Sequence, residues 1–188
     1  KAVQFLQRQA SSPADQPFFL FVSLTAPHAP FVPTEQVKGR SQAGRYGDSV
    51  ALADWSVGRL LNTLEKTGLL RDTLVLLTSD NGSLKSNKEM EPIYGHRPGH
   101  LFRGKKGDGL EGGHRVPLIV SWPGQFKPGT SNEVICQTDF FATFSEILGT
   151  KLPADAGEDS ISFLSVLKGK DLKQPIRESI IHYSSYGS

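Results

Sequence analysis

The sequence has little of several features that would place a protein in a special class. One cysteine, Cys136, occurs in 188 residues, so no intrachain disulfide can form and the redox compartment cannot be read. No apolar run approaches the roughly 20 residues that span a bilayer. The 21 Lys and Arg nearly balance the 19 Asp and Glu and do not cluster, so the sequence has no basic segment of the kind that binds nucleic acid or an acidic membrane surface. The rest is an ordinary globular composition.

The chain also begins without an initiator methionine or a signal peptide. Residues 1–10 are typical of the end of an amphipathic helix, with Val3, Phe5 and Leu6 on one side. A missing leader is uninformative if the chain is a piece of a longer protein. We expect it to be such a piece, forming one partial domain over residues 1–188.

Two apolar segments flank one helical pattern in the first half. Residues 17–25 and 73–79 are continuously apolar, as strands buried on both faces of a parallel sheet are. Between them, apolar residues from Val50 to Leu64 recur at steps of three and four, which predicts a helix over 46–67 with Gly68 at its C-terminal cap. Strand, helix and strand at this spacing make a βαβ unit. The predicted fold class is α/β, with a mostly parallel sheet sandwiched by helices.

The second half is less regular. Residues 80–116 are polar, glycine-rich and aperiodic, and so long a structureless loop in a compact domain is usually either functional or misassigned. A third strand is predicted over 117–122. Thr138 suits the N-cap of a helix over 139–148 that ends at Gly149. A short helix over 160–167 and a late strand over 178–183 are also expected.

Candidate functional residues follow the two predicted strands directly. His28 lies in Ala-Pro-His-Ala-Pro at 26–30, where the prolines restrict the backbone and hold the imidazole in place. Asp80 and Asn81 offer the oxygen ligands that Ca²⁺ or Mg²⁺ prefers, and Gly82 permits a sharp turn. Each alone could be a structural residue or an ordinary turn. Their common position at the carboxyl edge of one βαβ unit favours a ligand site.

The long loop contains a second candidate element. Between 104 and 113 it holds five glycines, which let the backbone approach an anion closely, and Lys105 and Lys106 bring positive charge. A solvated flexible loop would have a similar composition. Both interpretations stay open at this point.

Four motifs, in order and spacing, resemble those of one enzyme family. They are residues 26–30; Tyr-Gly-Asp at 46–48 leading to Asp-Trp-Ser-Val-Gly-Arg at 54–59; Thr-Leu-Val-Leu-Leu-Thr-Ser-Asp-Asn-Gly at 73–82; and the glycine-rich stretch 103–124. The chain is similar, over nearly its whole length, to type I sulfatases of the alkaline phosphatase superfamily, most of all to bacterial enzymes of the arylsulfatase A and N-acetylgalactosamine-6-sulfatase-like group. The resemblance implies an incomplete alkaline phosphatase/sulfatase-like α/β catalytic domain of a sulfuric ester hydrolase, acting on aryl or sugar sulfates.

The resemblance also implies roles for single residues. Asp80 and Asn81 match half of a calcium site, with Ca²⁺ expected in preference to Mg²⁺. His28 matches the histidine that contacts the sulfate and the leaving-group oxygen. Counting back from Glu-Gly-Gly at 111–113, the sulfate-binding lysine falls on Lys106 and not on Lys105. His28 and Lys106 are therefore the implied catalytic and substrate-binding residues.

Other residues of the long loop carry weaker expectations. Glu111, His114 and Arg115 match positions that hold the loop against the sheet. His96 and His100 are expected either to bind the substrate at the entrance of the active site or to have no role in the reaction. The partner implied is a sulfated small molecule or glycan, and the implied location is periplasmic or secreted. The oligomeric state cannot be read from the sequence.

Two departures from the family pattern matter. The family's nucleophile is a formylglycine made from Cys or Ser in a Cys/Ser-x-Pro/Ala-x-Arg motif that precedes the active-site histidine. Cys136 lacks both the Pro/Ala and the Arg, and we interpret it as a small buried residue. Ser41 to Arg45 fits the pattern but follows His28, so we interpret the match as coincidence. The formylglycine and the remaining metal ligands are expected upstream of Lys1, and the isolated chain is predicted to be inactive.

Two alternatives stay open. One is a phosphoester or phosphonate hydrolase of the same superfamily, which would use more metal ligands, histidines among them. The other is a non-catalytic relative that binds sulfated glycans.

Overall fold

The computed structural model describes residues 1–13 and 16–184. The helices and strands, in chain order, are α1 (Ala2–Gln9), α2 (Gly44–Lys66), the 3₁₀ turn η1 (Leu70–Asp72), β1 (Val75–Thr78), α3 (Asn87–Tyr94), α4 (Glu111–His114), β2 (Leu118–Ser121), α5 (Asp139–Ile147) and α6 (Leu164–Leu167). The chain divides into two compact units. The first comprises Lys1–Ile119 with Ser184, and the second Val120–Tyr183. No helix in the described ranges is long and apolar enough to cross a membrane.

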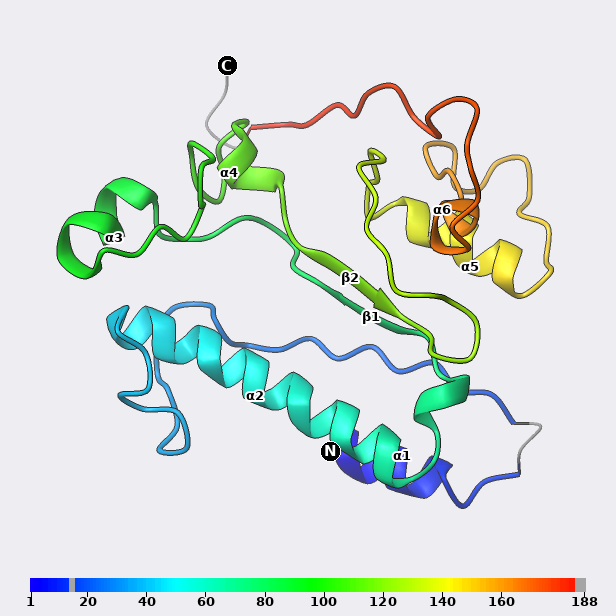
Figure 1. The fold of residues 1–188 in the computed structure, drawn as a ribbon, viewed down its shortest axis with the longest axis horizontal. Coiled ribbons are helices and arrows are strands. Elements are labelled where there is room, and N and C mark those ends of the chain that lie inside the picture. The colour runs from blue at the N-terminus through cyan, green and yellow to red at the C-terminus, as the bar shows by residue number, and fades with distance from the viewer. Residues whose placement is uncertain (14–15, 185–188) are drawn as a thin grey trace. The chain divides into compact units, whose positions relative to one another are not determined.

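Within the first unit, α2 is the longest element and α1 packs against it (Figure 1). Leu6 of α1 and Leu64 of α2 are 2% and 4% exposed. Full burial of a leucine contributes about 2 kcal/mol to folding, so this pair is a main part of the local core. The predicted buried stripe is correct at Leu64 but wrong at Val50, which is 42% exposed.

Helix α2 ends as the sequence predicts. Gly68 has φ of +76°, a conformation that costs little only without a Cβ. The Leu69 N–H donates to the Leu64 carbonyl at 2.9 Å and the Gly68 N–H to the Glu65 carbonyl at 3.0 Å. These two bonds form a Schellman motif, which satisfies carbonyls that the helix end would otherwise leave without donors.

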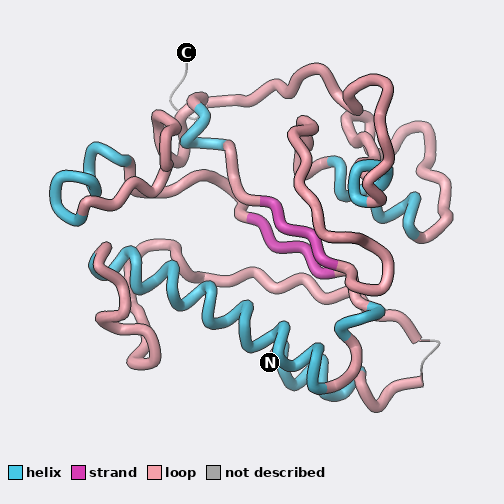
Figure 2. The backbone as a smooth tube through the Cα atoms, viewed as in Figure 1, coloured by secondary structure: helices cyan, strands magenta, loops and turns pink. Residues whose placement is uncertain are grey.

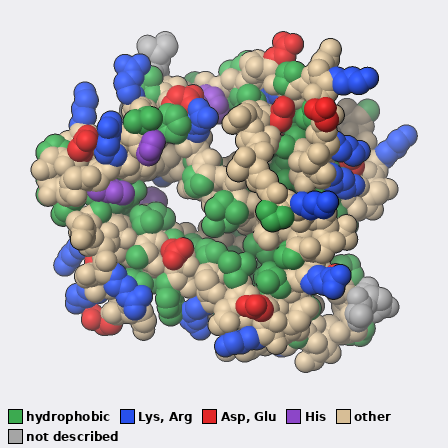
Figure 3. Space-filling view, in the orientation of Figure 1, with side chains coloured by type: hydrophobic (Ala, Val, Ile, Leu, Met, Phe, Trp, Pro, Cys, Tyr) green, Lys and Arg blue, Asp and Glu red, His purple; other side chains and the backbone are tan. Residues whose placement is uncertain are grey.

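Strands β1 and β2 form a two-stranded sheet within the described residues, and they run in opposite directions (Figures 1 and 2). The predicted strands at 73–79 and 117–122 are thus confirmed as shorter elements. The predicted parallel βαβ unit is not formed among the described residues, because residues 17–25 belong to no strand. Neither described strand pairs with that segment, and its Phe19 and Phe21 side chains are 77% and 79% exposed. Figure 3 shows hydrophobic side chains at the surface, among the charged ones.

The second unit is organised around α5 and α6. The helix predicted over 139–148 is confirmed, with Gly149 at φ +65° after its end, although the Thr138 side chain makes no capping bond. The predicted helix over 160–167 is confirmed only over its last turn, α6. The late strand predicted over 178–183 is wrong. Those residues form no strand and belong to no sheet that the structure describes.

A buried carboxylate joins the segments of the second unit. Asp139 has 0% exposure and accepts the N–H groups of Cys136 at 2.7 Å and Ile161 at 2.8 Å. The Arg177 guanidinium also donates to it. A buried charge is tolerated where it is paired and hydrogen-bonded in this way. Cys136 itself is half-buried rather than buried, and its position follows from this network.

Candidate active site

The turn after β1 presents two oxygen-bearing side chains. The Ser79 hydroxyl donates to the Asn81 carbonyl at 3.0 Å, and the Asn81 amide nitrogen donates to the Gly82 carbonyl at 3.0 Å. The Asn81 side-chain oxygen is therefore left as an acceptor. The Asp80 side chain is exposed, and within residues 1–13 and 16–184 its carboxylate makes no hydrogen bond or ion pair.

These oxygens fit a hard divalent cation by their chemistry, since Ca²⁺ takes six to eight oxygen ligands. Asp80 and Asn81 would supply only part of such a shell. No group of three or more His, Cys, Asp or Glu side chains that could hold a metal ion occurs in the part of the chain that the structure describes.

The glycine-rich loop is bound directly to this turn. The Gly82 N–H donates to the Gly113 carbonyl at 2.8 Å, and the Lys106 N–H donates to the Ser83 carbonyl at 2.8 Å. A Cβ on Gly82 would lie 1.9 Å from the Gly112 carbonyl oxygen, so only glycine permits this approach. The structure therefore brings Lys106 to the residues that follow Asp80 and Asn81.

The two adjacent lysines have different environments. The Lys105 ammonium lies 3.3 Å from a carboxylate oxygen of Glu89. Lys106 is half-buried, and its ammonium has no ion pair with any described residue. Among the described residues, Lys106 is thus the ammonium of the pair that has no carboxylate partner, and its role as the sulfate ligand stays a prediction.

The segment 80–116 is not structureless, because it contains α3 and α4, so the assignment of the whole segment as a loop is wrong in those parts. Helix α3 starts with a capping box, in which the Ser86 hydroxyl accepts the Glu89 N–H at 3.3 Å and the Glu89 carboxylate accepts the Ser86 N–H at 2.9 Å. The sequence Ser-Asn-Lys-Glu at 86–89 is the ordinary signature of this motif and could have predicted the helix. The Ser86 N–H and hydroxyl, followed by the two nearby lysines, lower the pKa of Glu89 to about 2.

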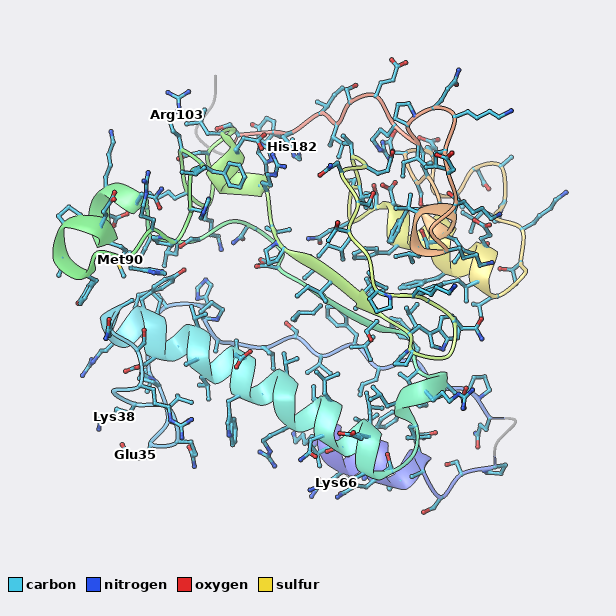
Figure 4. All side chains as sticks on the ribbon, in the orientation of Figure 1. Glu35, Lys38, Lys66, Met90, Arg103 and His182 are labelled. Carbon is cyan, nitrogen blue, oxygen red and sulfur yellow. The ribbon has the colours of Figure 1, made fainter. Side chains whose placement is uncertain are left out.

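The remaining loop residues hold the shape of the segment. Arg115 pairs with Glu111 at 2.8 Å, and its guanidinium lies 4.8 Å from the centre of the Phe102 ring. Both contacts agree with a structural role for these residues. Figure 4 shows Arg103 pointing outward from this loop, in agreement with its exposure.

His28 lies in a tight turn and is exposed. Its N–H donates to the Thr25 carbonyl at 2.9 Å, and its Nδ1 lies 2.6 Å from the Ala29 carbonyl oxygen. Since a carbonyl can only accept, Nδ1 carries the proton in this contact and Nε2 faces away from it. The turn thus fixes the imidazole through one nitrogen and leaves the other for a ligand.

Tyr46 joins the His28 segment to the turn after β1. Its ring packs edge-on against Phe31 at 5.5 Å between centroids, three residues beyond His28. Its hydroxyl lies 2.8 Å from the Ser83 hydroxyl, and Ser83 is the residue whose carbonyl holds Lys106. A continuous set of contacts therefore runs from the histidine segment to the lysine loop.

His96 and His100 have different positions. His96 lines a cavity of about 310 Å³ between the start of α2 and the end of α3, and its ring lies 6.2 Å from that of Tyr46. The cavity has no charged lining residue; its walls are Ser41, Gln42, Ala43, Gly47, Val50, Tyr94, Gly95 and His96. His100 is not part of that lining; its carbonyl accepts from the Asn87 amide at 2.9 Å. The structure brings His96 to a cavity next to Tyr46 and places His100 in a backbone contact.

The Ser41 side chain is engaged in a turn. Its hydroxyl accepts the Ala43 N–H at 3.0 Å, and its own N–H donates to the buried carboxylate of Asp48 at 2.8 Å. The Gly39 N–H binds the other oxygen of that carboxylate, and these backbone bonds lower the pKa of Asp48. A structural role accounts for Ser41, in agreement with the interpretation of its motif as coincidence.

Comparisons with known proteins place the chain in a family. The sulfatase family model matches residues 1–150. The chain is 37% identical over 161 residues to an N-acetylgalactosamine-6-O-sulfatase of Bacteroides thetaiotaomicron, covering 84% of the chain and 32% of that protein. It is 38% identical over 187 residues to the steryl-sulfatase of Mus musculus, covering 97% of the chain and 29% of that protein. The chain belongs to the sulfatase family.

Solved structures support the same fold. A sulfatase from Bacteroides thetaiotaomicron glycosaminoglycan metabolism matches with a TM-score of 0.81 and 35% identity, over 90% of the chain and 35% of that structure. The sulfatase PsFucS1 of Pseudoalteromonas sp. matches with a TM-score of 0.75 and 30% identity, over 92% of the chain and 34% of that structure. The predicted sulfatase-like α/β class is confirmed, and the chain spans about a third of the length of these relatives.

Proposed function

We propose that the chain is part of a sulfuric ester hydrolase, with His28 and Lys106 acting on the sulfate ester. The observation that supports the proposal is the contact between the turn after β1 and the lysine loop, because it brings the backbone of Lys106 to Ser83, two residues after Asn81. A sulfate ester is anionic, so its binding needs fixed positive charge, and the reaction needs more such charge as the leaving oxygen departs.

The residues of the chain divide this work. The Lys106 ammonium would bind a sulfate oxygen, because among the described residues it has no competing carboxylate. His28 would hold a hydrogen bond or a proton at the leaving-group oxygen through Nε2, while the Ala29 carbonyl fixes Nδ1. Tyr46 would keep the two segments in register through its contacts with Phe31 and Ser83.

The proposed cofactors are a calcium ion and a formylglycine. Asp80 and Asn81 would hold the metal, which when bound supplies positive charge to the sulfate oxygens. Neither Ser41 nor Cys136 is proposed as the nucleophile, since both are explained by local structure. We propose that the 188 residues alone do not turn over sulfate esters, because they would supply only two metal ligands and neither Ser41 nor Cys136 is proposed as the nucleophile.

We propose a sulfated glycan as the substrate class and, from the resemblance alone, a periplasmic or secreted location. The first relative acts, by its name, on an N-acetylgalactosamine 6-O-sulfate. A further solved relative, with 31% identity and a TM-score of 0.52, was determined with its substrate D-glucosamine-2-N,6-O-disulfate. The uncharged cavity at His96, with an aromatic wall and several hydrogen-bonding groups, fits the neutral part of a sugar better than a second sulfate.

The test is the activity of the full-length product of the gene on matched esters. We expect turnover of 4-nitrophenyl sulfate well above that of 4-nitrophenyl phosphate, and turnover of 6-sulfated N-acetylgalactosamine. Lys106→Ala should lower kcat/KM by about 100-fold or more, as removal of one preorganised positive group does. Lys105→Ala, the matched control, should cost less than tenfold. Preference for the phosphate ester, or binding of sulfated sugars without turnover, would contradict the proposal.

A further inference from the structure

Glu89, in the first turn of α3, forms ion pairs with two lysines that lie outside the helix. Its Oε1 lies 3.3 Å from the Lys85 ammonium, one helical turn away in sequence. Its Oε2 lies 3.3 Å from the Lys105 ammonium, 16 residues away. Only the second pair joins α3 to the glycine-rich loop, so the two bonds have different consequences.

The Glu89 carboxylate is held in place independently of both lysines. Oε2 also accepts from the Ser86 N–H and from the Ser86 hydroxyl, each at 2.9 Å. Helix α3 is itself anchored by Met90, which is 4% exposed, and by the Asn87 side chain, which binds the Gly99 N–H at 2.9 Å. Glu89 is therefore a fixed negative group to which a mobile lysine can be bound.

The loop at Lys105 is a tight turn next to the candidate active site. The Lys105 N–H donates to the Asp108 carboxylate at 2.9 Å, and the Asp108 N–H donates to the Lys105 carbonyl at 3.0 Å. The next residue, Lys106, is bound through its N–H to Ser83. Holding the Lys105 side chain on α3 thus restrains the backbone that carries Lys106.

We propose that Glu89 and Lys105 are positioning residues for sulfate binding: Glu89 captures the Lys105 ammonium and so fixes the turn from which Lys106 alone reaches the anion. The proposal rests on the proposed function of Lys106. In this proposal Lys105 has a structural role, and Lys106 binds the anion. The pair is 38–40% exposed, so solvent screens it and the expected effect is moderate.

The experiment uses Glu89→Gln and Lys105→Gln in the full-length product of the gene. Glutamine still accepts from Ser86 in a capping box, so Glu89→Gln removes the charge and keeps the helix start. Lys85→Gln is the matched control, because it breaks the ion pair that is local to the start of α3 and does not reach the glycine-rich loop. The measurements are KM and kcat for 4-nitrophenyl sulfate, the calorimetric Kd of inorganic sulfate, and the melting temperature.

We expect both Glu89→Gln and Lys105→Gln to raise KM and the sulfate Kd about two- to fivefold, with kcat nearly unchanged. The double variant should be no worse than either single one, and Lys85→Gln should match the wild type. A role in folding alone would lower the active fraction, and hence the apparent kcat, without changing KM. That result, an unchanged Kd, or tighter sulfate binding by a released Lys105 would overturn the proposal.

The two proposals fail in distinguishable ways. A wild type that turns over no sulfate ester contradicts the proposed function, and the sulfate Kd of the three variants still tests the positioning pair. A wild type that is active, with all three variants alike in KM and Kd, contradicts the positioning pair alone.

Discussion

Replacing Gly82 by alanine tests the contact on which the candidate active site depends. The added Cβ would lie 1.9 Å from the Gly112 carbonyl oxygen, whereas real Cβ atoms essentially never come within 3.0 Å. The two segments must therefore separate by about 1 Å, which stretches the 2.8 Å bond from the Gly82 N–H to the Gly113 carbonyl. Overpacking costs about 1–3 kcal/mol and a lost hydrogen bond about 0.5–1.5 kcal/mol. We expect Gly82→Ala to lower the free energy of unfolding by about 2–4 kcal/mol.

The assay is urea denaturation of the full-length product of the gene, together with hydrogen exchange at the Lys106 N–H. Gly58→Ala is the matched control, because Gly58 lies in α2 with nothing within 4 Å of the added Cβ. Alanine has the higher helix propensity, so Gly58→Ala should stabilise by about 0.5–1 kcal/mol. Exchange at Lys106 should accelerate only in Gly82→Ala. Equal stability of Gly82→Ala and wild type, with unchanged exchange, would refute the close approach of the two segments.

Two further predictions concern buried or perturbed carboxylates. Asp139→Asn should lower the free energy of unfolding in urea by about 3–5 kcal/mol, because it leaves the Arg177 guanidinium without its buried counter-charge. Asp159 is exposed, so Asp159→Asn should change the free energy of unfolding by less than about 0.5 kcal/mol. Similar values for the two variants would contradict the account of the second unit. The folded pKa of Glu89, about 2, lies below its ordinary value of 4.5, so its ionised form stabilises the fold above about pH 4.5 and this contribution is lost as the pH falls toward 2. The stability difference between wild type and Glu89→Gln should therefore shrink over that range, and a difference independent of pH would contradict it.

Local signals in the sequence predicted the helices best. The three- and four-residue spacing of apolar residues predicted α2, and Gly68 predicted its end. Gly149 predicted the end of α5. The capping box at Ser86 and Glu89 was equally local, but the polar, glycine-rich and aperiodic composition around it led to the prediction of a loop. Continuous apolar composition was the weakest guide, because residues 17–25 have the composition of a strand without a described pairing partner.

The candidate site could be predicted in kind but not in geometry. Asp80, Asn81, His28 and Lys106 were placed by motif order, and whether they bind metal or substrate stays a prediction. No local pattern indicated that Glu89 would bind Lys105, since the two are 16 residues apart and meet only because α3 folds back onto the loop. The distinction between the two lysines depends on that tertiary contact.

The central claim is that His28, the pair Asp80 and Asn81, and Lys106 surround one sulfate group. The most direct measurement is a crystal structure of the full-length product of the gene with calcium and inorganic sulfate. We predict a calcium ion 2.3–2.6 Å from oxygens of Asp80 and Asn81. We also predict sulfate oxygens within about 3.2 Å of the Lys106 ammonium and of the His28 Nε2. A sulfate bound by Lys105 instead, or one that lies away from the turn after β1, would contradict the account.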